Sequence, residues 1–113
     1  MGTLANLARN KERLREVAQR VAKRLDAARV MGEAGSGAVR VTANGQLRIV
    51  LVEISPALVT ATDASHKELA EGLIAEATNR ALAQARLAAR DIINDEAQGL
   101  GLPELPEDLG GVL

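Results

Sequence analysis

The segment that decides the fold covers residues 32–54 and reads GEAGSGAVRVTANGQLRIVLVEI. Residues 39–43 alternate apolar and polar side chains, which is the pattern of a half-buried β-strand. The Asn44-Gly45 pair follows directly, and both residue types tolerate the positive φ angles of a two-residue type I′ turn. The sequence therefore predicts a hairpin whose return strand covers residues 46–54.

The return strand is apolar on both of its faces. Strict alternation places Leu47, Ile49 and Leu51 on one face, and Val50, Val52 and Ile54 on the other. A strand of this kind needs a packed layer on each side. A helix can supply one layer, and we expect a second copy of the chain to supply the other. The predicted dimer-interface residues are Leu47, Ile49, Val50, Leu51 and Val52.

Three glycines, at positions 32, 35 and 37, precede the first strand of this hairpin. They could cradle a phosphate group or turn the chain between two strands. A P-loop needs a lysine after its last glycine, and the dinucleotide-binding motif needs a helix there. Here Gly37 is followed by Ala38 and a predicted strand. We therefore predict a corner between two strands, the first of which begins near Val30.

Long helices are predicted on both sides of the sheet in the sequence. Residues 4–28 place apolar side chains at alternating spacings of four and three, with Lys11 at the one seam position that is polar. Pro56 ends the return strand because proline cannot donate to a β-ladder. Ser65 and Glu68 have the spacing of a capping box. They predict the start of a second, alanine-rich helix that runs to about Asp95.

This order of elements predicts an α+β fold with a long N-terminal helix, a small antiparallel sheet of three strands and a long C-terminal helix. We expect residues 1–97 to form a single domain. Residues 98–113 contain two prolines and four glycines without periodicity, which is typical of a flexible tail. The chain has no Phe, Tyr or Trp, so a monomer lacks the largest burial units, and self-association would compensate.

The composition argues against an enzyme. Cysteine is absent, which excludes disulfides, thiolate nucleophiles and cysteine metal sites. The one histidine, His66, lies at the predicted start of a helix. Asp91 and Asp95 share a helix face and could bind a hard cation loosely, although solvation is the simpler role. We expect no cofactor and no metal, and the lack of a long apolar run predicts a cytoplasmic protein.

Charge is distributed unevenly along the chain. Residues 1–32 contain eight Lys or Arg and three acidic residues, a balance of +5, whereas residues 33–113 contain six and twelve, a balance of −6. This asymmetry indicates that the N-terminal helix meets an anion, although a merely solvated helix face would look the same. A stripe about 60° wide beside the apolar seam contains Arg9, Arg13, Arg20 and Arg24. Lys11, Arg15 and Lys23 lie elsewhere around the helix.

Two motifs and their order suggest a known family. The run VMGEAGSGAVRVTANG is followed by VEISPAL and by a helix that contains EATNRA. Together they resemble the YbaB/EbfC family of bacterial nucleoid-associated proteins, whose patterns are V-x-G-E-S-G-x-G-x-V-x-V-T-x-N-G and V-E-I-x-P-x-L. Ala34 stands at the family's serine and Ser55 at its usual aspartate. The N-terminal helix is rich in Arg and Ala, where the family often has Met and Gln.

The resemblance implies a homodimer in which the strands join at the centre and the helices project as two arms, like tweezers. It also implies binding of double-stranded DNA with little sequence preference, a role at the nucleoid, and neither enzymatic activity nor a cofactor. We assign the DNA contacts to basic residues on the projecting helices. They are Arg9, Lys11, Arg13, Arg15, Arg20, Lys23, Arg24, Arg86 and Arg90.

Two functions remain open at this point. The first is a dimeric protein that binds duplex DNA, and the alternative is a dimeric scaffold that binds a partner protein and no DNA. The isoelectric point of about 5.8 favours the scaffold, since strong non-specific DNA binders are usually basic. The charge asymmetry and the resemblance favour DNA. The lack of aromatic residues argues against a stacking platform for single strands.

Overall fold

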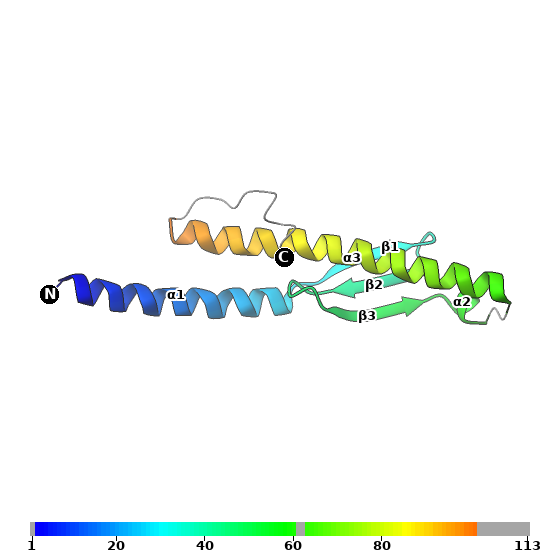
Figure 1. The fold of residues 1–113 in the computed structure, drawn as a ribbon, viewed down its shortest axis with the longest axis horizontal. Coiled ribbons are helices and arrows are strands. Elements are labelled where there is room, and N and C mark those ends of the chain that lie inside the picture. The colour runs from blue at the N-terminus through cyan, green and yellow to red at the C-terminus, as the bar shows by residue number, and fades with distance from the viewer. Residues whose placement is uncertain (1, 61–62, 102–113) are drawn as a thin grey trace.

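The protein is elongated, with extents of 75 × 23 × 17 Å. Its two long helices are offset along the long axis and overlap over only part of their length (Figure 1). The computed structural model describes residues 2–60 and 63–101. The elements are α1 (Gly2–Ala27), β1 (Val30–Ala34), β2 (Val39–Ala43), β3 (Ile49–Ile54), α2 (Pro56–Thr60) and α3 (Ala64–Gly99). The predicted α+β fold, with a long helix before and after a three-stranded antiparallel sheet, is confirmed.

The core lies between the sheet and the middle of α3. The strand order is β1-β2-β3, and both pairings are antiparallel. The inward side chains of β2, Val39, Val41 and Ala43, are fully buried, as are Ala77, Ala81 and Ala85 of α3. Small alanine side chains allow the helix backbone to approach the strands closely. Figure 1 shows α3 crossing β1 and β2 while β3 remains at the open edge.

Gly32 is required by this close approach rather than by a turn. It lies buried within β1, and a Cβ atom built on it would be 2.3 Å from the backbone nitrogen of Ala81 and 2.4 Å from the carbonyl oxygen of Ala77. These are backbone atoms of α3, and unlike side-chain atoms they cannot rotate away from an added methyl group. The prediction that all three glycines serve a strand corner is therefore wrong for Gly32.

The other two glycines do form the predicted corner between β1 and β2. Gly35 and Gly37 have φ angles of 64° and 87°, and Ser36 between them has a φ of 55°. Glycine adopts this left-handed region without steric cost, because it has no Cβ. The Ala38 amide closes the turn by donating to the carbonyl of Gly35 over 3.1 Å.

The Asn44-Gly45 pair does not form the predicted two-residue turn. Residues 44–48 connect β2 to β3, and among the described residues of this loop the positive φ belongs to Leu47, at 61°. The buried Asn44 side chain organises the loop, because its Oδ1 accepts from the amides of Gln46 (2.9 Å) and Arg48 (3.2 Å). Gly45 instead donates its amide to the carbonyl of Leu25 over 2.8 Å. This contact joins the end of α1 to the sheet.

A bulge in β3 changes which of its side chains share a face. Thr42 pairs with Leu51, but Ala43 pairs with Ile49, so Val50 has no partner in the register. Directly paired residues point to the same side of a sheet, and a bulge inserts one extra residue into that alternation. Ile49 therefore lies on the buried side of β2 and Leu51 on the opposite side. The prediction that Ile49 and Leu51 share a face is wrong.

The ends of α3 differ from those predicted. Its N-cap is Asp63 rather than Ser65, and an oxygen of the Asp63 side chain accepts from the amide of His66 over 2.7 Å. The helix continues past Asp95 to Gly99. Residues 98 and 99 of the predicted tail are thus helical, whereas residues 102–113 lie outside the described residues. No helix within residues 2–60 and 63–101 is both long and apolar enough to cross a membrane.

Candidate nucleic-acid interface

The predicted DNA-contacting residues gather where α1 runs alongside the C-terminal half of α3. The two helices are antiparallel and extend away from the sheet (Figure 1). Among residues 9–27 of α1, no side chain is fully buried. Val17, Val21 and Leu25 are half-buried, and Leu14 is 56% exposed. Most side chains of residues 9–27 are therefore exposed.

Three of the four arginines in the stripe on α1 contact α3. Arg20 Nε donates to Glu96 Oε2 over 3.1 Å. Arg24 Nη1 lies 2.7 Å from Asp95 Oδ2 and 3.1 Å from Glu96 Oε1. Arg13 Nη2 donates to the carbonyl oxygen of Gly99 over 3.3 Å. Arg20 and Arg24 are four residues apart and so share one side of the helix, which is why one pair of carboxylates can bind both.

These ion pairs explain why acidic residues cluster near the end of α3. Carboxylates in the last turns of a helix are unfavourable beside the negative end of its dipole, and the guanidinium groups of α1 compensate that charge. The hydrogen bonds to Asp95 and then to Glu96 raise the pKa of Arg24 above its ordinary value. Asp91 takes no part, since it is exposed and its nearest cation is Arg90, 3.9 Å away.

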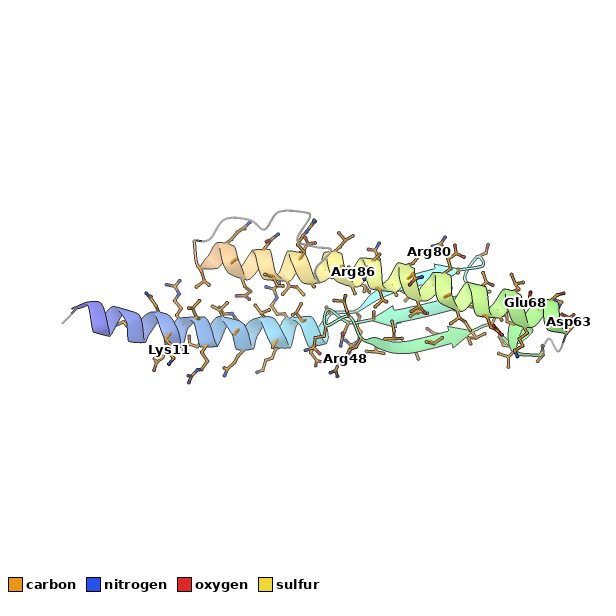
Figure 2. The ribbon with its side chains drawn as sticks, in the orientation of Figure 1. Lys11, Arg48, Asp63, Glu68, Arg80 and Arg86 are labelled. Atoms are coloured by element: carbon orange, nitrogen blue, oxygen red, sulfur yellow. The ribbon has the colours of Figure 1, made fainter. Side chains whose placement is uncertain are left out.

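A second group of predicted cations has no partner within the described residues. These side chains are exposed and have neither a hydrogen bond nor an ion pair there; they are Arg9, Lys11, Arg15, Lys23 and Arg86. Figure 2 shows Lys11 on the side of α1 that is turned away from α3. The structure thus divides the predicted site into free cations and cations held by α3. Arg90 is intermediate, with a side chain that is 23% exposed and close to Asp91.

The predicted site does not include Arg48, an exposed cation close to α1. It lies in the loop between β2 and β3, where α1 meets the sheet (Figure 2). Its side chain has no hydrogen bond or ion pair among the described residues. Strict alternation predicts that Arg48 lies inside the return strand. The structure instead has a five-residue loop over residues 44–48, which the alternation of side chains does not reveal.

The exposed edge strand is the other candidate contact surface. Every residue of β3 is exposed, including the apolar Ile49, Val50, Leu51, Val52 and Ile54, whose exposed fractions lie between 37% and 51%. The other predicted interface residue, Leu47, is half-buried and packs against the core cluster. Met31 of β1, which is 50% exposed, was not predicted. Val52 and Ile54 project on the same side as the core but beyond the area that α3 covers.

The described part of the chain has no cluster of three or more His, Cys, Asp or Glu side chains that could hold a metal ion.

The sequence profile of the YbaB/EbfC DNA-binding family matches residues 1–100. The chain belongs to this family. A nucleoid-associated protein of Hahella chejuensis is similar, with 29% identity over 102 residues, which is 90% of this chain and 91% of the relative. These names describe DNA binding and nucleoid association, not an enzymatic activity.

A crystal structure of an uncharacterized Helicobacter pylori protein has the same fold. It matches with a TM-score of 0.56 and 21% identity, and the match covers 88% of this chain and 95% of that protein. The YbaB/EbfC motif positions in the present chain have structural roles: Gly32 and Gly45 permit backbone contacts, and Asn44 builds a loop. The family motif therefore defines the fold, while the cations of α1 lie outside the motif.

Proposed function

We propose that this YbaB/EbfC protein binds duplex DNA as a homodimer, largely without sequence preference, and contributes to nucleoid organisation or gene regulation. The observation that carries the proposal is a set of exposed cations on α1 that have no partner among the described residues: Arg9, Lys11, Arg15 and Lys23. Such a cation can neutralise a DNA phosphate and release its counterion. Such a cation can bind a phosphate without first breaking an ion pair with a carboxylate.

The chemistry of these side chains favours contacts with the DNA backbone. Lysine and arginine bind phosphate oxygens strongly, and phosphate contacts fix the position of a protein on DNA without reading its sequence. Net charge is −1 for the whole chain, so the favourable field is local to α1 and is opposed by the acidic remainder. This combination predicts modest affinity that falls steeply with salt.

The homodimer is supported by the apolar edge of the sheet. An uncovered edge strand with exposed apolar side chains on it is prone to pair with another chain. A second copy that covers Ile49, Val50, Leu51 and Val52 would place two α1 helices in one particle. Two linked sets of cations bind a long polyanion more strongly than one. We also propose that residues 1–97 form one domain, because Gly45 ties α1 to the core shared by the sheet and α3.

Fluorescence anisotropy with labelled duplexes tests DNA binding. Two 20-base-pair duplexes of unrelated sequence should bind with similar affinity, and log K should fall linearly with log[salt] by about 0.9 per neutralised phosphate. Lys11→Ala combined with Arg15→Ala should weaken binding to both duplexes equally and make the slope shallower by up to about 2. Lys67→Ala removes an exposed cation from the opposite end of the molecule and controls for the loss of positive charge in general, and each single variant, Lys11→Ala and Arg15→Ala, is compared with it.

The acidic isoelectric point keeps the scaffold function as the second candidate. If the unmodified protein binds neither duplex at about 50 mM salt, where phosphate contacts are strong, the DNA-binding proposal is wrong. If the double variant binds like the Lys67→Ala control, the contact surface lies elsewhere than on the free cations of α1. A protein partner for the arms would then be sought instead.

Light scattering tests the dimer. We expect a mass of twice the 11.9 kDa of one chain. Leu51→Asp should give the monomer mass while retaining helical circular dichroism, because Leu51 is 51% exposed in a single chain and its loss leaves the core intact. The control is Leu87→Asp, at a residue that is also exposed but lies on α3. A monomer mass for the unmodified protein would refute the homodimer.

A further inference from the structure

We propose that Asp95 and Glu96 occupy the place of DNA phosphates on Arg20 and Arg24, so that the C-terminal end of α3 competes with DNA for this part of α1. This inference rests on the proposed function. It adds a step in which two carboxylates are exchanged for phosphate groups. It also assigns different roles to the free and the paired cations of α1.

The geometry of the cluster supports the exchange. Arg20 makes two contacts of 3.1 Å with one carboxylate oxygen of Glu96, through Nε and through Nη2. Arg24 bridges Glu96 and Asp95 through a single nitrogen. The guanidinium group recognises carboxylates and phosphates with the same planar set of donors. A phosphate group between Arg20 and Arg24 could therefore use the same donors that the two carboxylates use now.

The exposure of the cluster allows the exchange to occur. The side chains of Arg20 and Arg24 are 56% and 41% exposed, and that of Asp95 is 66% exposed. Exposed ion pairs contribute little to stability and are weakened by salt. Only Glu96, at 12%, is largely covered. Because no described side chain of α1 is fully buried, few contacts would oppose a small shift of α1 away from α3.

The exchange has a consequence for the dependence of DNA binding on salt. When Arg20 or Arg24 binds a phosphate, the DNA releases a counterion, but the freed carboxylate attracts a cation from solution. The two effects partly cancel, so these two arginines add less to the salt slope than free cations do. Removing the carboxylate charges should restore the full contribution, about 0.9 for each phosphate.

The first test compares two variants that carry the same change of net charge. Asp95→Asn with Glu96→Gln removes both competing charges, and Glu68→Gln with Glu71→Gln removes two exposed charges from the start of α3. On one 20-base-pair duplex, the Asp95/Glu96 variant should bind several-fold more tightly than the Glu68/Glu71 variant. Its salt slope should be steeper by up to about 2. Equal affinities and equal slopes would overturn the inference, and weaker binding would overturn it by showing that the carboxylates hold α1 in the binding position.

The second test does not depend on DNA. Because the chain contains no cysteine, Ala22→Cys and Gln98→Cys can carry spin labels on α1 and α3 without other reactive thiols. The labelled protein is mixed with excess unlabelled protein, so that distances between subunits do not contribute. Inorganic tripolyphosphate should lengthen the label distance in the otherwise unmodified protein. In the Asp95/Glu96 variant the distance should be long from the start.

The two tests separate this inference from the proposed function. If DNA does not bind but tripolyphosphate lengthens the distance, the DNA-binding function fails and the exchange stands. If DNA binds while the label distance stays constant and the two charge-matched variants have equal slopes, the function stands and the exchange is wrong.

Discussion

The helix α3 is held in two different ways along its length. Where it crosses the sheet, Ala77, Ala81 and Ala85 are fully buried against the inward side chains of β1 and β2. Where it runs beside α1, arginine side chains reach Asp95 and Glu96, and the ion pairs are largely exposed. In the first region, close packing is possible because the alanine side chains are small. In the second region, the contacts are electrostatic.

This difference shows which contacts maintain the fold and which are available for function. Burying a valine such as Val39 or Val41 contributes about 1.5–3 kcal/mol, whereas ion pairs exposed to solvent contribute little. Ions in solution weaken the second kind of contact but leave the first almost unchanged. A ligand with phosphate groups can therefore act on the α1–α3 pair without disturbing the core.

The largest expected effect is at Gly32, where the backbone of α3 touches the sheet. In Gly32→Ala the new Cβ would meet the backbone of Ala77 and Ala81 at less than 2.5 Å. We expect a loss of stability at or above the upper end of the about 1–3 kcal/mol that overpacking a core costs. Urea denaturation at one fixed protein concentration measures it.

Gly72→Ala is the control for this substitution. Gly72 lies in α3, and no other side chain or strand comes within 4 Å of the position that the new methyl group would take. The change should therefore stabilise the helix by about 0.5–1 kcal/mol. An unchanged urea midpoint for Gly32→Ala would contradict the close contact of strand and helix.

A smaller effect is expected at Gly45, where the loop touches α1. A Cβ there would lie 2.9 Å from the carbonyl oxygen of Leu25. In Gly45→Ala the end of α1 can shift, because α1 is not buried, so we expect a loss of about 1–2 kcal/mol. Hydrogen exchange should show faster exchange in α1 and unchanged protection in α3. Equal loosening of both helices would mean that α1 is as firmly packed as the core.

A third contact, at the start of α3, depends on pH. Hydrogen bonds from the His66 backbone, and then from its side chain, hold the pKa of Asp63 below its ordinary value of 3.8. A lowered folded pKa means that the cap stabilises the helix fully above pH 3.8 and loses this effect as pH falls through the lower, folded value. The protection factor of amides near His66, which is corrected for the intrinsic pH dependence of exchange, should therefore fall only at acidic pH. Asp63→Asn keeps a capping oxygen without the titration, so its protection factor should not show this fall.

The smallest effect on stability is expected in the α1–α3 ion pairs. Arg20→Gln removes the contacts of the guanidinium group with Glu96, yet the arginine is 56% exposed. We expect a urea midpoint that stays within experimental error of the unmodified protein. A loss as large as that of Gly45→Ala would contradict this expectation by showing that the ion pairs contribute strongly to the stability of the whole fold.

Local patterns predicted the elements but not every contact between them. Alternation located β2, and the glycines at 35 and 37 were correctly read as a turn, because the conformation of these residues is a local property. The Asn44-Gly45 turn was wrong because the Gly45 amide bonds to Leu25, twenty positions earlier in the chain. The faces of β3 were wrong because the bulge at Val50 depends on the pairing with β2.

The candidate site shows the same limit. Helical periodicity correctly placed Arg13, Arg20 and Arg24 on one side of α1, but their partners could not be known without the packing of α1 against α3. Asp95 and Glu96 lie 71 to 76 positions away from the arginines that they bind. Arg48 was missed because the loop that exposes it replaced the first residues of the predicted strand.

By itself, the sequence determined the α+β order of elements, the absence of a phosphate-binding loop and the concentration of positive charge on the first helix. These properties follow from composition, periodicity and the backbone preferences of single residues, which act over a few positions. Only the tertiary structure decided which cations of α1 are free and which are paired, and which strand lies exposed at the edge. Both depend on the antiparallel alignment of helices and strands, which brings distant charges within a few ångströms and leaves other side chains without a partner among residues 2–60 and 63–101.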